Sequence, residues 1–92
     1  MNTLMSHALA KQSAFNAATA SAELIKKILA EYPQAEIHPR EVPMADEDVS
    51  MEIILPLSMH EIYNVRDRIY DWVIELQDRY DVLILASAIP KA

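Results

Sequence analysis

The sequence predicts a single α+β domain, a two-layer sandwich in which two helices pack on a small mixed sheet in the order α-β-β-α-β. Two stretches, residues 13–32 and 58–79, repeat apolar side chains at the three- and four-residue spacing of a helix. Three shorter apolar stretches, at residues 35–42, 49–55 and 82–89, are typical of strands. The chain of 92 residues has the length of one domain, spanning residues 1–92, and its 52% hydrophobic content is too high for a disordered chain.

The first helix is predicted from one apolar stripe and ends before Pro33, which disfavours the helical conformation of the preceding residue. Residues 1–12 are rich in alanine but have only a thin apolar stripe. We expect them to extend this helix, to fray as a loosely docked N-terminal extension, or to belong to a subunit interface. The predicted stripe consists of Phe15, Ala18, Ala22, Ile25, Leu29 and Tyr32.

The first predicted strand covers residues 35–42. Pro39 cannot donate a hydrogen bond to a neighbouring strand, so this strand is expected at an edge of the sheet or at a bulge. Residues 43–48 are polar and acidic, as in a loop. In residues 49–55 apolar side chains alternate with a more mixed set, which predicts a strand with one well-buried face: Val49, Met51, Ile53 and Leu55.

The second helix begins with a capping box at Ser58 and Glu61. The Ser58 hydroxyl is expected to accept the Glu61 N–H, and the Glu61 carboxylate to accept the Ser58 N–H in return. The helix is predicted to run to about Arg79. Its main apolar stripe is Ile62, Val65, Ile69, Trp72, Val73, Leu76 and Tyr80.

The last strand, residues 82–89, is an almost continuous apolar run, which predicts a strand buried on both faces. Strand, helix and strand then form a βαβ unit over residues 49–89, whose two strands should be parallel. This arrangement is close to the ferredoxin-like class of two-layer sandwiches.

Composition excludes several functions. The chain has no glycine, so the phosphate-binding loops that need a residue without Cβ are missing, and it has no cysteine for disulfides, thiol chemistry or zinc. The net charge of −6, with no run of basic residues, argues against a nucleic-acid ligand. The sequence shows no membrane span and no signal peptide, which predicts a cytoplasmic protein. It predicts no cofactor and no catalytic residue.

Residues 46–90 resemble the second half of a minimal nucleotidyltransferase domain of the polymerase-β type. The resemblance rests on an acidic turn before an apolar strand, on Arg66-Asp67-Arg68-Ile69 in the helix, and on Tyr80-Asp81-Val82 before the last strand. In that family a Gly-Ser motif binds nucleotide phosphates and an Asp-x-Asp pair holds magnesium. Here only Asp48 falls on that pair, Ser50 takes the second position, and the Gly-Ser motif is absent. The resemblance therefore implies a degenerate member that has lost transferase chemistry.

The order of elements is also similar to the cytoplasmic dimerisation domain of cation-diffusion transporters, but the metal-binding histidine pattern of that family is absent. The one cluster that could bind a divalent cation is the acidic run Asp46-Glu47-Asp48 with Glu52 on the following strand, and Asp48 is its candidate ligand; the run is otherwise typical of a solvated loop. The three histidines have no ligand spacing, and we predict no metal site: His7, His38 and His60.

A second set of residues on the second helix predicts an interface. It adjoins the main stripe, so that the apolar arc is about 200° wide, although a helix on a sheet needs roughly 100°. Either the first helix covers this flank within the chain, or a second copy or another protein does. The leading hypothesis is a non-catalytic, homodimeric protein-interaction module of unknown pathway; the alternatives are a divergent nucleotidyltransferase-like enzyme and a small-ligand sensor. The predicted interface residues are Met59, Tyr63, Arg66, Tyr70 and Ile74.

Overall fold

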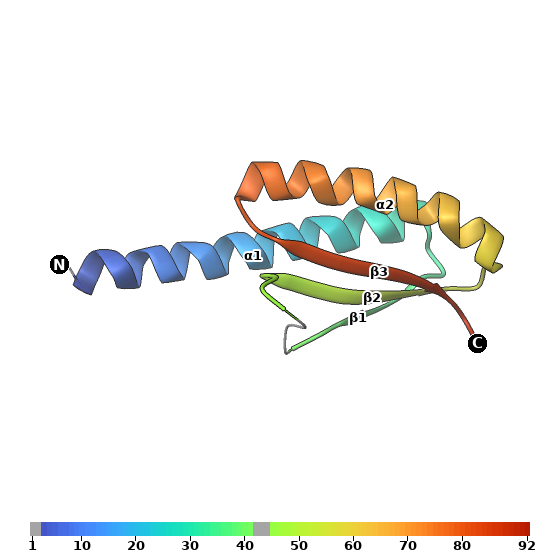
Figure 1. Cartoon of the computed structure of the whole chain (residues 1–92), viewed down its shortest axis with the longest axis horizontal. Coiled ribbons are helices and arrows are strands. Elements are labelled where there is room, and N and C mark those ends of the chain that lie inside the picture. The colour runs from blue at the N-terminus through green and yellow to red at the C-terminus, as the bar shows by residue number, and fades with distance from the viewer. Residues whose placement is uncertain (1–2, 42–44) are drawn as a thin grey trace.

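The fold is the predicted α+β sandwich. The computed structural model describes residues 3–41 and 45–92, with side chains from Gln12 onward. Figure 1 shows both helices on the same face of a three-stranded sheet. The elements follow in the predicted order: α1 (Thr3–Glu31), β1 (Glu36–Pro39), β2 (Val49–Leu55), α2 (Met59–Tyr80) and β3 (Ile84–Pro90).

The sheet is mixed, with β2 in the centre. β1 pairs antiparallel with β2, and β3 pairs parallel with it, which confirms the predicted parallel strands. In this register Met51 lies between Pro39 and Ala86. Pro39 is therefore on an edge strand, as expected from its missing N–H. Residues 42–44, where the predicted first strand ends and the loop begins, lie outside the described residues.

One prediction about the sheet is wrong: β3 is not buried on both faces. It is the second edge strand, and the side chains of Leu83 and Leu85 are exposed. The reason is that α1 and α2 cover the same face of the sheet (Figure 1). The side chains that alternate toward the other face, Leu85, Ser87 and Ile89, have no helix above them.

The core lies between the two helices and the covered face of the sheet. The alternation predicted for residues 49–55 is confirmed, because Val49, Met51, Ile53 and Leu55 are all buried. The main stripe of α2 is confirmed as well, with Trp72 and Tyr80 packed at its margin. The buried residues of α2 are Ile62, Val65, Ile69, Val73 and Leu76.

The predicted face of α1 is wrong. The fully buried side chains are Ala20, Leu24 and Ile28, whereas Phe15 is 65% exposed and Leu29 is 41% exposed. Ala18 and Ala22 are also exposed, whereas Ile25 and Tyr32 of the predicted stripe are partly buried and pack against the core. This helix carries apolar residues on two neighbouring faces, and the one that meets β2 and α2 is the Leu24 face.

The N-terminal part of α1 continues the helix rather than forming a separate element. Figure 1 shows it running past the end of the sheet. The molecule is accordingly elongated, with extents of 53 × 23 × 18 Å along its principal axes. Of the predicted extension, residues 1–12, the first two lie outside the described residues. A role of this extension in a subunit interface stays a prediction.

The two ends of α2 are capped by side chains and by backbone geometry. The Glu61 N–H donates to Ser58 Oγ at 3.3 Å, as predicted. The carboxylate does not return to the Ser58 N–H; it accepts from the Ser58 hydroxyl at 2.9 Å. At the other end Asp81 adopts the left-handed conformation, with φ 54° and ψ 52°, and its N–H donates to Gln77 O at 2.9 Å. Asp81 takes here the left-handed position after a helix that is usually filled by glycine.

Candidate functional site

The flank of α2 that the sequence singled out is exposed. Tyr63 is 56% exposed, Tyr70 is 62% exposed and Ile74 is 40% exposed, and Met59 at the start of the helix is similar. The first helix therefore leaves this flank uncovered, although it packs along the other side of α2. Single exposed apolar residues are ordinary, but a row of them on one flank of a helix is a feature of interaction surfaces.

Arg66 is the polar member of this row and is only half-exposed. Its Nε donates to Ala88 O at 3.0 Å, which ties α2 to the outer edge of β3. Its guanidinium also lies over the Tyr63 ring, 5.6 Å from the ring centroid. The hydrogen bond to β3 thus positions the Arg66 side chain, and the guanidinium in turn contacts the Tyr63 ring. Tyr and Arg are enriched among the residues that dominate binding energy at protein interfaces.

An open groove of about 610 Å³ runs between the exposed flank of α2 and β3. Its floor is the outer edge of β3, and its wall is the side of α2 that carries Tyr70. The lining includes apolar side chains and two polar ones that reach the strand, Arg66 and Gln77. We call this groove together with the exposed flank the α2–β3 surface. The α2 residues that line the groove are Arg66, Asp67, Ile69, Tyr70, Val73 and Gln77.

Gln77 lies on the same arc of α2 as the predicted interface residues, but its contact with β3 is not predicted from the sequence. Its Oε1 accepts the Ile84 N–H at 2.9 Å. Arg66 and Gln77 therefore hold two backbone groups of the strand edge, one near each end. No sequence pattern specifies a side chain that hydrogen-bonds a distant backbone group, and the sequence does not predict the strand order that leaves one edge of β3 free.

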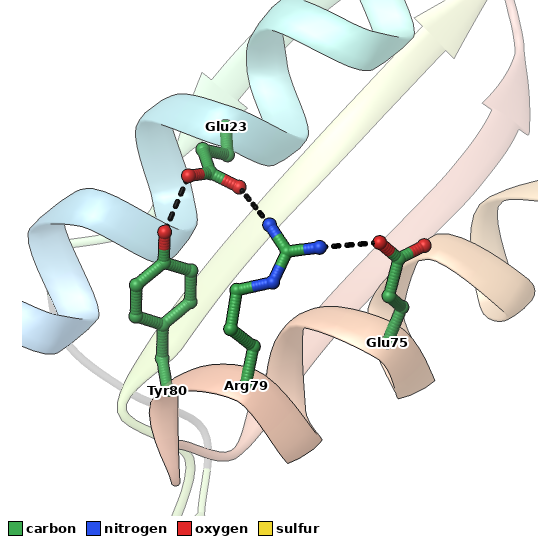
Figure 2. A network of polar contacts seen from close by, with 4 residues as sticks. All are labelled: Glu23, Glu75, Arg79 and Tyr80. Carbon is green, nitrogen blue, oxygen red and sulfur yellow. Dashed lines mark hydrogen bonds and ion pairs between the residues drawn. The ribbon is translucent and has the colours of Figure 1, made fainter.

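A separate polar network joins the two helices. Figure 2 shows Glu23 of α1 between two residues of α2: the Tyr80 hydroxyl donates to one carboxylate oxygen, and Arg79 pairs with the other at 3.1 Å. Arg79 also pairs with Glu75 at 2.6 Å. The hydrogen bond to Glu23, assisted by partial burial, raises the pKa of Tyr80 above its usual value. This network fixes α1 against the end of α2 and lies away from the groove.

The helix-free face of the sheet carries its own polar pairs. Arg40 donates to Ser50 Oγ at 3.1 Å and pairs with Glu52 at 3.5 Å. At the other end of the strands Lys91 pairs with Glu36 at 3.0 Å, and this hydrogen bond lowers the pKa of the Glu36 carboxyl. These contacts cross between strands and satisfy the charges they involve.

Asp48, the candidate metal ligand, has a structural partner. Its Oδ2 accepts the Leu83 N–H at 2.8 Å, while the Asp48 N–H donates to Leu83 O at 2.8 Å. Within residues 3–41 and 45–92 no group of three His, Cys, Asp or Glu side chains is placed to hold a metal ion. Of the histidines, His38 lies 3.9 Å from Glu36 and His60 is exposed, and the side chain of His7 lies outside the described residues.

No protein family matches the chain, and no curated protein and no solved structure is detectably similar. The nucleotidyltransferase resemblance of residues 46–90 thus stays a prediction. In the part of the chain that the structure describes, no helix is both long and apolar enough to cross a membrane.

Proposed function

We propose that this chain is a non-catalytic protein-interaction module and that it forms a homodimer through the α2–β3 surface. The observation that carries the proposal is the exposure of Tyr63, Tyr70 and Ile74 in one row beside an open groove. The core stripe of α2 is complete without them. These side chains are therefore not needed for the fold, and a surface role explains their position better than packing does.

The energetics favour association of such a surface. Each 100 Å² of apolar area removed from water contributes about 2.5 kcal/mol at roughly 25 cal/mol per Å². A twofold arrangement uses every residue of the surface twice. For a dimer to form, the gain from burying the tyrosines and Ile74 of both copies has to exceed the cost of lost translational and rotational freedom, about 4 to 15 kcal/mol.

Tyr70→Glu tests this proposal against a matched control. In a dimer the new carboxylate loses its hydration without a partner, which costs about 3 kcal/mol or more and raises the dissociation constant by at least roughly 100-fold. Leu29→Glu is the control, because Leu29 is 41% exposed on the other helix, almost the same as Ile74. Sedimentation equilibrium measures both affinities, and circular dichroism checks that both variants fold.

The expected result is a folded Tyr70→Glu monomer and a Leu29→Glu dimer with the affinity of the wild type. If Leu29→Glu dissociates the protein and Tyr70→Glu does not, the interface lies on α1 and the proposal is wrong. If Tyr70→Glu unfolds, the exposed flank has a role in the fold itself. Ile74→Glu serves as a second variant on the same flank and should behave as Tyr70→Glu does.

A further inference from the structure

The outer edge of β3 contains an unusual pattern of occupied and free backbone groups. Leu83 O accepts the N–H groups of Asp48 and Val49, and the Lys91 N–H donates to Leu55 O. The odd-numbered residues of this strand therefore turn their backbone groups toward β2. The even-numbered residues, Ile84, Ala86 and Ala88, therefore turn theirs outward. This agrees with the contacts made by Gln77 and Arg66.

Among the described residues, two of these outward groups have partners. The Ile84 N–H is bound by Gln77 and the Ala88 carbonyl by Arg66. Among the described residues nothing bonds the Ile84 carbonyl, the Ala88 N–H, or either backbone group of Ala86. Beyond them Pro90 has no N–H to offer. Both backbone groups of Ala86, at the centre of the edge, are free to bond another strand, whereas one group each of Ile84 and Ala88 is already bonded.

We infer that this edge pairs with the same edge of a second copy, antiparallel and centred on Ala86, so that the dimer contains one continuous sheet; this inference rests on the proposed homodimer. In an antiparallel pair, directly opposite residues can exchange both of their hydrogen bonds. Centred on Ala86, the strand places Ala86 opposite Ala86 and Ile84 opposite Ala88.

The pattern of free groups is self-complementary in this register. The two copies of Ala86 bond each other reciprocally, and each free Ala88 N–H meets the free Ile84 carbonyl of the second copy. Each occupied Ile84 N–H meets an occupied Ala88 carbonyl, so the contacts of Gln77 and Arg66 need not break. Where Ile84 of one copy meets Ala88 of the other, the Gln77 Oε1 acceptor of the first copy lies beside the Arg66 Nε donor of the second. A strand of another protein would instead place two backbone groups of its own, without partners, opposite the occupied Ile84 N–H and Ala88 carbonyl.

Side chains support the same pairing. The register places Leu83, which is exposed, opposite Ile89 of the second copy on the helix-free face. On the helix side the small Ala86 lies at the twofold axis. Arg66 lies near Ala88 and Gln77 near Ile84, so Tyr70 and Ile74 are close to that axis and meet their own copies. Strand pairing and burial of the exposed flank thus occur in one arrangement.

Disulfide cross-linking tests the register. Because the chain has no native cysteine, any disulfide must join the introduced residues. Leu85 of one copy lies opposite Ser87 of the other, in a pair without backbone hydrogen bonds, where Cα atoms are about 4.5 Å apart and a disulfide can form. The variants Leu85→Cys and Ser87→Cys are refolded together under reducing conditions and then oxidised. A disulfide-linked dimer should form in the mixture and in neither variant alone.

Leu83→Cys mixed with Ser87→Cys is the matched control, because it carries the same chemistry on the same face two residues away. Cross-linking of this control, or of Leu85→Cys alone, would show a different register and overturn the inference. A wild-type dimer that gives no disulfide in the Leu85→Cys and Ser87→Cys mixture overturns strand pairing but leaves the homodimer standing. A monomeric wild-type protein overturns both the homodimer and the pairing of β3 with its copy; a strand of another protein is then the remaining partner for this edge.

Discussion

Two substitutions of the same kind, Leu24→Ala and Leu29→Ala, test which face of α1 packs against the core. Leu24 is fully buried and Leu29 is 41% exposed on the same helix. The sequence pattern alone places Leu29 in the core stripe and leaves Leu24 out of it. Both changes replace leucine by alanine within one helix, so differences in helix propensity cancel between them.

The expected magnitudes follow from burial. At Leu24 the loss of buried methyl and methylene groups costs about 2.4 kcal/mol at ~0.8 kcal/mol each, and a cavity of ~40 Å³ adds about 1 kcal/mol. We therefore expect a loss of about 3 kcal/mol. At Leu29 part of the side chain already meets water and no cavity is left, so the loss should not exceed about 1 kcal/mol. A chain of this length has a total stability of about 5 to 14 kcal/mol, so the first change is severe.

Urea unfolding followed by circular dichroism measures both losses. All samples are compared at one protein concentration, because dimerisation would make stability depend on concentration. With a slope of about 1.5 kcal/mol per molar urea, Leu24→Ala should lower the midpoint by about 2 M. An equal or larger loss for Leu29→Ala would show that α1 packs through the face with Phe15 and Leu29, which would refute the packing described here.

Two further predictions concern the polar contacts of the helices. Ser58→Ala should lower stability by about 1 kcal/mol, because the Glu61 N–H loses its acceptor, and Ser58→Asp should restore most of it; urea unfolding measures this, and no loss would mean that α2 begins elsewhere. The raised pKa of Tyr80 means that the bond to Glu23 stabilises the fold below the ordinary tyrosine pKa of about 10 and that this contribution is lost as pH rises through the folded value. Glu23→Gln should lower that pKa in an ultraviolet absorbance titration that uses Tyr80→Phe to identify the signal, and an unchanged pKa would contradict the role of Glu23.

The sequence predicts α2 well because its signals are local and agree with one another. Ser58 and Glu61 mark its start, and the large residues of its stripe are separated by polar ones. For α1 the pattern is ambiguous, since alanines lie on both apolar faces and Phe15 and Leu29 are larger than several buried residues. Which face is buried depends on the positions of β2 and α2, and local periodicity does not contain that information.

The position of β3 could not be predicted for a related reason. Its residues are apolar without alternation, which is typical of a strand covered on both faces. The structure supplies helices on one face only, so Leu85 and Ile89 remain on the other. The candidate surface is predictable in part, because the width of the apolar arc predicts Tyr63, Tyr70 and Ile74, and the structure shows all three exposed. The strand edge, and its contacts with Arg66 and Gln77, depend on tertiary structure.

The solution mass of the wild-type chain tests the central claim most directly. The chain has a mass of 10.4 kDa. Sedimentation velocity at tens of micromolar protein should show a species of twice that mass, which dissociates on dilution as expected for a dimer of moderate affinity. A single species of 10.4 kDa over the whole concentration range would contradict the homodimer and, with it, the pairing of β3 edges.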